Sequence, residues 1–229
     1  MNGPNVALDE YPFMLVSDIH ADPKALERVL AKSPDVRYKC FLGDVIGYGD
    51  EPEKAVDLIS GFDVGIMGNH DALAVGKNDL NIFSDNAKKT TPLHVEMLSE
   101  DQLNIISGFV NTFKRNGYLL LHGSPESFNH YLFNEEYLKK TFENHPEFQV
   151  FFGGHLHIPR FASYDLKSGK IEFEELDKPF SRHHLDLSKK KYFINCPSTT
   201  SGRLGSDPGY CTFYHVSHDE KILNYHFFD

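Results

Sequence analysis

The chain has 229 residues, long enough to bury a substantial core without dividing into two domains. Its 40% hydrophobic and 13% aromatic content excludes an intrinsically disordered chain. The formal net charge of −10 argues against bulk nucleic-acid or anionic-membrane binding, so an anionic substrate requires a local positive centre. No apolar run reaches the roughly 18 to 20 residues of a membrane span, and the first 12 residues lack a signal-peptide pattern, which predicts a cytoplasmic protein.

The first part of the chain alternates strand and helix patterns. Short apolar runs at residues 13–16, 40–42 and 64–67 alternate with helices expected from Asp22 and from Glu51. Asp22 is suited to cap the first helix, because a proline follows at the first helical position. Strands buried on both faces and joined by helices predict parallel βαβ units.

The middle of the chain predicts a helical insert at about residues 73–116, inside a single domain that spans residues 1–229. Within it, Ser99 and Gln102 form a capping-box pattern. Beyond it, strands are expected at 118–121 and 150–152, with a helix from Glu135 to Asn144 between them. After Gly154, short strands separated by turns predict a largely antiparallel second sheet; they lie at 161–164, 171–173, 192–194, 211–216 and 222–228.

The three cysteines are odd in number and widely spaced, and they are expected to be structural, unreactive thiols. They are Cys40, Cys196 and Cys211.

Five polar clusters follow the apolar runs, where open α/β sheets place their ligand sites. They are Asp18-Ile19-His20, Gly43-Asp44, Gly68-Asn69-His70-Asp71, His122-Gly123 and Gly154-His155-Leu156-His157. Side chains two positions apart in an extended chain point the same way, so Asp18 and His20 can face one cavity. Carboxylate, imidazole and amide donors suit Mn²⁺, Fe, Co²⁺, Ni²⁺ or Zn²⁺. The neighbouring glycines permit close backbone approach.

A histidine in any one of these clusters, taken alone, is more often a packed or surface residue than a metal ligand. Their recurrence at five strand ends favours a metal site, because several buried Asp and His side chains without partners would be costly to desolvate. The remaining histidines are expected at the surface or in packing; they are His94, His130, His145, His183, His184, His215, His218 and His226. Of these, His130 follows His122 in the same loop and could line the site.

The chain resembles the calcineurin-like metallophosphoesterases, whose motifs D-x-H, G-D, G-N-H-D/E, H and G-H-x-H occur here in order. Residues 43–49 and 122–125 look closest to the small bacterial phosphodiesterase branch. The resemblance implies an α/β (α+β) fold, a four-layer αββα sandwich of two mixed sheets flanked by helices. It also implies two metal sites bridged by Asp44. One would use Asp18, His20, Asp44 and His157, and the other Asp44, Asn69, His122 and His155.

The resemblance further implies that His70 donates a proton or contacts phosphate, with Asp71 orienting its ring. Substrate contacts are expected from Asn69, His70, Arg160 and Arg203. The branch commonly carries N-P-G-S-V-G-x-P-R, whereas residues 195–203 read N-C-P-S-T-T-S-G-R. Both glycines of this motif are replaced, which puts the reach of Arg203 in question because Pro and Thr do not adopt the positive φ that Gly permits.

The expected function is that of a dinuclear-metal phosphoesterase. Two divalent cations contribute +4 against −2 from Asp18 and Asp44, leaving a positive centre for phosphate. Metals about 3.5 to 4 Å apart could share a water and lower its pKa for in-line attack, and His70 would protonate the leaving alkoxide. A phosphodiesterase acting on a small phosphate ester with Mn²⁺ is favoured.

Three alternatives remain open: a phosphomonoesterase, a dinucleoside polyphosphate hydrolase and a non-catalytic binding scaffold. The complete ligand set and His70 argue against the scaffold. Protein phosphatases of the family carry an Arg soon after the G-N-H-E motif, where residues 72–75 read A-L-A-V here, which argues against phosphoprotein substrates. The sequence does not determine the natural substrate, the native metal or the oligomeric state, and a homo-oligomer is one of the open alternatives.

Overall fold

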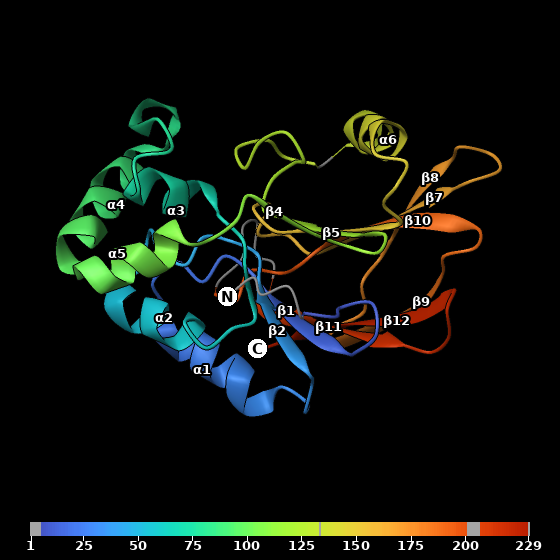
Figure 1. Ribbon diagram of the computed structural model, residues 1–229, viewed down its shortest axis with the longest axis horizontal. Helices are drawn as coiled ribbons and strands as arrows, with labels where there is room; N and C mark the ends of the chain where they lie inside the picture. Colours follow the sequence, from blue (N-terminus) through green and yellow to red (C-terminus); the bar gives the residue numbers. More distant parts are fainter. Residues whose placement is uncertain (1–5, 133, 201–206, 229) are drawn as a thin grey trace.

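The computed structural model describes residues 6–132, 134–200 and 207–228, which form two six-stranded sheets packed face to face between helices (Figure 1). The helices are α1 (Pro23–Lys32), α2 (Pro52–Ile59), α3 (Asn69–Ala74), the short 3₁₀ helix η1 (Leu80–Ile82), α4 (Asp85–Met97), α5 (Glu100–Ser107) and α6 (Glu135–Asn144). In spatial order, the first sheet contains β3 (Val64–Gly65), β2 (Tyr38–Phe41), β1 (Phe13–Val16), β11 (Gly209–His215), β12 (Glu220–Phe227) and β9 (Phe180–Asp186). The second contains β4 (Thr112–Arg115), β5 (Tyr118–Leu121), β6 (Val150–Gly153), β10 (Lys190–Asn195), β7 (Arg160–Asp165) and β8 (Ile171–Glu174). The expected four-layer arrangement of two mixed sheets is confirmed.

Each sheet combines parallel and antiparallel pairs. In the first, β1, β2 and β3 are parallel, whereas β11, β12 and β9 continue from β1 in antiparallel fashion. In the second, β5, β6 and β10 are parallel and the remaining pairs are antiparallel. The strands after Gly154 therefore divide between the two sheets, and the prediction that they form one antiparallel second sheet is wrong. Apolar alternation specifies a strand but not the neighbour with which it pairs.

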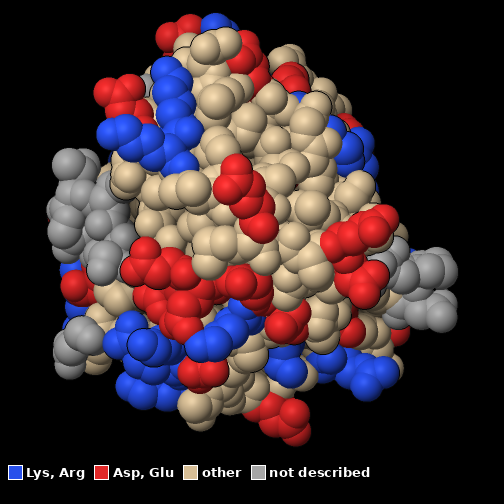
Figure 2. All heavy atoms as spheres, turned by 90° about the vertical axis from the view of Figure 1, so that its left-hand side faces the viewer, with Lys and Arg blue, Asp and Glu red and all other residues tan. Residues whose placement is uncertain are grey.

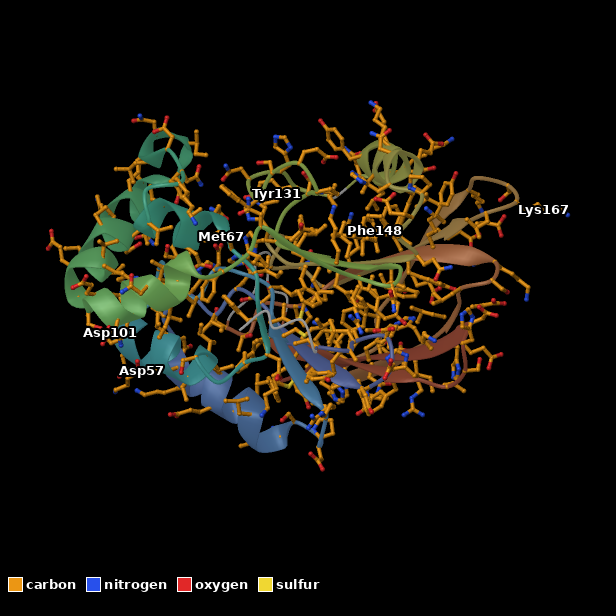
Figure 3. The ribbon with its side chains drawn as sticks, in the orientation of Figure 1. Asp57, Met67, Asp101, Tyr131, Phe148 and Lys167 are labelled. Atoms are coloured by element: carbon orange, nitrogen blue, oxygen red, sulfur yellow. The ribbon has the colours of Figure 1, made fainter. Side chains whose placement is uncertain are left out.

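Three apolar clusters hold the four layers together. Between the sheets, the ring of Phe13 lies 5.4 Å from that of Phe152 and 5.1 Å from that of Phe213. A second cluster joins the first sheet to α1 and α2, and a third joins the second sheet to α6. Side chains fill the space between the two sheets (Figure 3). This packing fixes the ends of the parallel strands relative to one another.

The predicted helix starts are confirmed. Asp22 Oδ1 accepts a hydrogen bond from the backbone N–H of Ala25 at 3.0 Å, at the start of α1. Ser99 and Gln102 form the expected reciprocal capping box at the start of α5. Helix α6 has the predicted bounds.

The insert is helical only as far as Ser107. Residues 112–115 form β4, which pairs antiparallel with β5, so the expectation of helical structure up to Asn116 is wrong at that end. Asn116 and Gly117 have φ values of 35° and 84°. Positive φ at both central residues is typical of a two-residue hairpin turn, for which Asn-Gly is the strongest short-range signal.

The face formed by the helices at the left of Figure 1 carries acidic and basic side chains together, with no broad basic surface (Figure 2). No helix in the described part of the chain is both long and apolar enough to cross a membrane. All three cysteines are buried and form no disulfide. Burial raises the pKa of the Cys40 and Cys211 thiols well above the usual value, as expected of unreactive thiols.

Candidate metal centre

The seven expected ligands follow the carboxyl ends of β1, β2, β3, β5 and β6; Asn69 is the first residue of α3, and the other six lie in loops. All of these strands belong to the parallel parts of the two sheets. Such ends meet along one edge, where α/β proteins place their ligand sites. Each ligand side chain is buried; they are Asp18, His20, Asp44, Asn69, His122, His155 and His157.

The structure brings these side chains together in two groups that share one carboxylate. The donor atoms within each group lie within 4.8 Å of one another; the groups are Asp18, His20, Asp44 and His157, and Asp44, His122 and His155. Asn69 adjoins the second group, with Oδ1 3.1 Å from His122 Nε2. The two sets proposed from the sequence therefore converge in space, with Asp44 between them.

The backbone holds five of the seven residues in the left-handed region. The φ values are 52° at Asp18, 50° at His20, 62° at Asp44, 67° at His155 and 59° at His157. A non-glycine residue in this region typically costs about 1 to 3 kcal/mol and persists where the surrounding structure enforces it. This concentration of strain at one site is characteristic of a functional centre.

Glycines allow the loops of the cluster to approach closely. A Cβ atom on Gly68 would collide with the carboxylate of Asp44. Gly43 has φ of +100°, and a Cβ there would collide with the ring of His122. The sequence prediction of close backbone approach beside the ligands is thus confirmed at these two positions.

Backbone carbonyls orient three of the histidine rings. His20 Nδ1 lies 3.1 Å from Ile46 O, and His122 Nδ1 lies 2.7 Å from Leu42 O. His155 Nε2 lies 3.4 Å from the carbonyl oxygen of Asn129. An N–H donated to a carbonyl leaves the lone pair of the other ring nitrogen for a cation, which is the usual arrangement around metal-binding histidines.

The inner atoms of the cluster fit a cation better than they fit one another. Nε2 of His20 and Nε2 of His157 face each other at 2.8 Å. Asp18 Oδ1 is buried without a hydrogen-bond partner, although it lies 3.2 Å from His157 Nε2. Leaving such an oxygen buried is unfavourable unless a cation binds it. Oxygen and nitrogen donors without thiolates suit a divalent transition metal.

The electrostatics of the cluster favour positive charge. Burial opposes the charged form of His122, but Asp44, at 3.2 Å, and Asp18 outweigh it and raise the pKa of His122 to about 9. Burial also opposes ionisation of Asp44, yet the nearby histidines, His122 foremost, hold its pKa well below the usual value. Burial and the neighbouring His157 lower the pKa of His20 to about 3. The carboxylates therefore remain ionised and draw cations into the site.

His70 is oriented differently from the sequence expectation. Its Nδ1 lies 3.1 Å from Oγ1 of Thr91, a fully buried residue of α4. The carboxylate of Asp71 instead accepts hydrogen bonds from the backbone N–H groups of Asp44, Val45 and Gly68. Asp71 thus braces the loop that carries Asp44, and the prediction that it orients the ring of His70 is wrong.

Arg160, at the start of β7, contacts an aromatic ring of β8. Its guanidinium lies over the ring of Phe173, 5.1 Å from the centroid, and it lines a cavity formed by β7, β8 and residues near the C-terminus. Neither of the cavities beside the metal cluster includes Arg160. Arg203 lies outside the described residues. In the described part of the same motif, Ser198 Oγ donates a hydrogen bond to Asp18 O at 2.8 Å.

The sequence interpretation missed several residues that contact the cluster. The ring of Tyr131 stacks on that of His155, with centroids 4.0 Å apart and an interplanar angle of 10°. Tyr48 packs against both His20 and His70. His94 accepts a hydrogen bond from the Gly47 N–H and binds Gly49 O through its other nitrogen, so it holds the loop after Asp44. The Asp-Val-Ile-Gly-Tyr-Gly run is a local signal for Tyr48 alone.

Two of the other histidines, His183 and His184, lie in β9. His183 is buried and stacks on Phe161, with ring centroids 4.2 Å apart, which agrees with the expected packing role. His130 lines a cavity next to the cluster.

A family model described as calcineurin-like phosphoesterase matches residues 11–159. The chain belongs to this family. Accordingly, it is a metal-dependent phosphoester hydrolase, and its buried His and Asp cluster is suited to a divalent metal centre. An uncharacterized protein of Methanocaldococcus jannaschii is 28% identical over 221 residues, which cover 90% of this chain and 82% of that protein.

Solved structures show the same fold. A metallophosphoesterase from Sphaerobacter thermophilus has a TM-score of 0.76 and 24% identity, covering 95% of this chain and 88% of that one. A hypothetical protein from Pyrococcus horikoshii has a TM-score of 0.66 and 13% identity, covering 96% of this chain and 89% of that one. At these identities the likeness concerns the fold alone.

Proposed function

We propose that the chain is a phosphodiesterase whose seven clustered side chains hold two divalent transition-metal ions, with Mn²⁺ preferred. The observation that carries this proposal is the place of Asp44 in both groups of donor atoms. Cations bound there supply positive charge for the phosphoryl oxygens and a water acidic enough to act as a nucleophile near neutral pH. The protein contributes the rigid loops that fix the donor atoms before substrate arrives.

His70 is the proposed proton donor to the leaving oxygen. It follows Asn69 directly but belongs to neither group of donor atoms. With Nδ1 held by Thr91, Nε2 is the nitrogen available to a substrate. Burial lowers the pKa of His70, so an anionic phosphoryl group nearby is needed to favour its protonated form. Tyr48 and Phe83 pack against the ring and keep it in place.

The charges around the cluster favour a diester over a monoester. A cavity of about 260 Å³ lies beside His122 and is lined mainly by Asn, Ser and Thr side chains. Lys77 is the one Lys or Arg among the described residues that line it. A diester carries one negative charge, whereas a monoester carries nearly two at pH 7 and needs more positive charge for binding. A phosphomonoesterase or a dinucleoside polyphosphate hydrolase is the alternative.

We propose that the substrate is a small phosphate ester and that the protein acts in the cytoplasm. The net charge of −10 and the mixed charges of the helical face (Figure 2) disfavour binding of long nucleic acids. A scaffold without catalysis is disfavoured because all seven donor residues and His70 are assembled.

Metal analysis and a substrate panel test the proposal. The purified protein should contain close to two transition-metal ions per chain and should hydrolyse bis-p-nitrophenyl phosphate faster than p-nitrophenyl phosphate. The panel should also include a dinucleoside polyphosphate. Absence of bound metal, together with no hydrolysis after addition of Mn²⁺, Ni²⁺ or Co²⁺, would refute the proposed metal-dependent activity. Faster cleavage of the monoester would refute only the diesterase assignment.

A further inference from the structure

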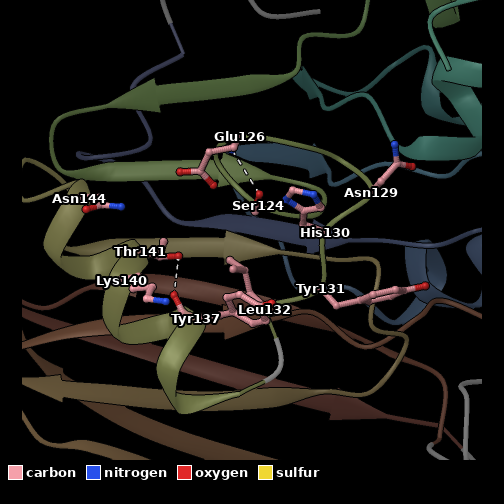
Figure 4. A pocket seen from close by; sticks show the side chains of 10 residues that line it. All are labelled: Ser124, Glu126, Asn129, His130, Tyr131, Leu132, Tyr137, Lys140, Thr141 and Asn144. Atoms are coloured by element: carbon pink, nitrogen blue, oxygen red, sulfur yellow. Dashed lines mark hydrogen bonds between the residues drawn. The ribbon is translucent and has the colours of Figure 1, made fainter.

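A second cavity lies between the loop after β5 and helix α6, and we call it the α6 pocket. Its volume is about 520 Å³, within the roughly 300 to 1,000 Å³ typical of small-molecule sites. It is lined by Ser124, Glu126, Asn129, His130, Tyr131, Leu132, Tyr137, Lys140, Thr141 and Asn144 (Figure 4). No part of the proposed metal chemistry uses this space.

The loop that walls the α6 pocket also contacts the metal cluster. Asn129 provides the carbonyl that orients His155, and the ring of Tyr131 stacks on the same histidine. Ser124, Glu126 and Asn129 line both the α6 pocket and the smaller polar cavity beside His122. One loop therefore borders the cluster, the polar cavity beside His122 and the α6 pocket.

The pocket carries no net fixed charge that would attract a second phosphate group. Its two ionisable side chains of fixed sign are Glu126 and Lys140, whose charges cancel. Lys140 Nζ is already 2.7 Å from Glu136 Oε1, and Glu126 Oε1 is 3.0 Å from His145 Nε2. An anionic group would meet the carboxylate of Glu126 without an unpaired ammonium to balance it.

The uncharged part of the lining suits a planar ring. Tyr137 is 52% exposed and Tyr131 37% exposed, and both of these large aromatic side chains line this one cavity. Figure 4 shows Tyr137 beside the buried side chain of Leu132, with Tyr131 towards the other end. Tyrosine rings bind other rings by stacking or edge contact, and Asn144 offers a polar amide at the rim.

We infer that the α6 pocket binds one esterified group of the substrate, an uncharged group of nucleoside size with a planar ring, while the phosphate lies at the cluster. This inference rests on the proposed phosphodiesterase function and narrows its substrate class. It argues against substrates whose second half is another phosphate chain.

Titration with thymidine, an uncharged ring compound, tests the pocket without requiring catalysis. Amide resonances of residues 124–132 and 135–144 should shift in NMR spectra of the protein loaded with diamagnetic Zn²⁺, and glycerol at the same concentration should leave them unchanged. Thymidine should also inhibit hydrolysis of bis-p-nitrophenyl phosphate competitively.

Variants of Tyr137 make the test specific. Tyr137→Ala should weaken thymidine binding and inhibition by roughly tenfold, because it removes a ring contact. Tyr137→Phe, which keeps the ring, should retain both. Tyr11→Ala is the matched control, since Tyr11 is 46% exposed and packs against Tyr38 far along the chain from the pocket residues.

The two proposals fail in different ways. Shifts of the α6 amides without any ester hydrolysis would overturn the phosphodiesterase proposal and leave the ring-binding pocket standing. Ester hydrolysis without amide shifts on addition of thymidine, or with shifts that Tyr137→Ala does not change, would overturn the ring-binding proposal. The phosphodiesterase proposal would then still stand. Stronger shifts of the α6 amides with pyrophosphate than with thymidine would also overturn it in favour of a charged occupant.

Discussion

The molecule holds two groups of buried or half-buried histidines that differ in how the backbone presents them. His20, His155 and His157 lie after parallel strands with φ between 50° and 67°, and their ring nitrogens face other donor atoms. His183 and His226 lie inside antiparallel strands of the first sheet. His183 has both ring nitrogens paired, one with Ser181 and one with Glu174, while His226 stacks on Tyr210.

Burial alone therefore does not distinguish a metal-binding histidine from a packing one. The strand histidines satisfy their polar atoms with single neighbours, whereas the cluster histidines leave nitrogens directed at one another. In these examples, backbone strain accompanies only the histidines of the metal cluster. Strain that the fold maintains without an evident packing benefit is the better sign of function.

The largest expected effect separates the two groups by metal content. Asp44→Ala removes the carboxylate shared by both groups of donors, so it should weaken metal binding by more than about 100-fold and abolish hydrolysis. His183→Ala should retain both ions but lower the free energy of unfolding by about 1 to 3 kcal/mol, because it removes a packed ring. Elemental analysis and thermal unfolding measure the two outcomes. Wild-type metal content in Asp44→Ala would show that the coordination scheme is incorrect.

The next effect separates proton transfer from metal binding. His70→Gln should keep both ions, yet kcat should fall by about 10² to 10⁴-fold for esters with a poorly stabilised alkoxide leaving group. An ester that releases p-nitrophenolate should be affected less, because this leaving group needs little protonation. Metal content, melting temperature and kcat for the two esters provide the measurement. An equal loss for both esters, with metal retained, would instead make His70 a phosphate contact.

A smaller effect tests Thr91 as a positioning residue for His70. Thr91→Val keeps the volume of the side chain but removes Oγ1, so kcat should fall by roughly 3- to 10-fold, corresponding to one hydrogen bond of about 0.5 to 1.5 kcal/mol. Thr91→Ser should restore most of the rate. The loss should again be greater for the alkoxide ester. A lower melting temperature, with the dependence of kcat on the leaving group unchanged, would assign Thr91 a purely structural role.

The smallest effect concerns a strand histidine and pH. Burial lowers the pKa of His226 to about 4, against about 6.5 in an unfolded chain. The unfolded state therefore binds a proton first, so the contribution of His226 to stability is complete above pH 6.5 and is lost as the pH falls towards 4. In that range the free energy of unfolding should fall more steeply for wild type than for His226→Gln. His218→Gln, at a side chain 97% exposed, should keep the wild-type slope.

Much of the fold was predictable because its signals are local. The proline after Asp22 and the spacing of Ser99 to Gln102 predict two helix starts, and both agree with the structure. The hairpin turn at Asn116 and Gly117 had an equally local signal, which the helical interpretation of the insert overlooked. Strand β9 was missed because residues 180–186 are mostly polar or charged, which hides a period of two whose inward side chains include His183.

The sequence by itself determined the donor set and its order, since ligand type and two-residue spacing are properties of each short segment. Only the tertiary structure decided that the strands after Gly154 divide between two sheets, and that Thr91, not Asp71, contacts the ring of His70. It alone placed Arg160 over the ring of Phe173. These outcomes depend on packing between segments far apart in the chain, because a side chain's partner is fixed by which layers meet and not by its sequence neighbours.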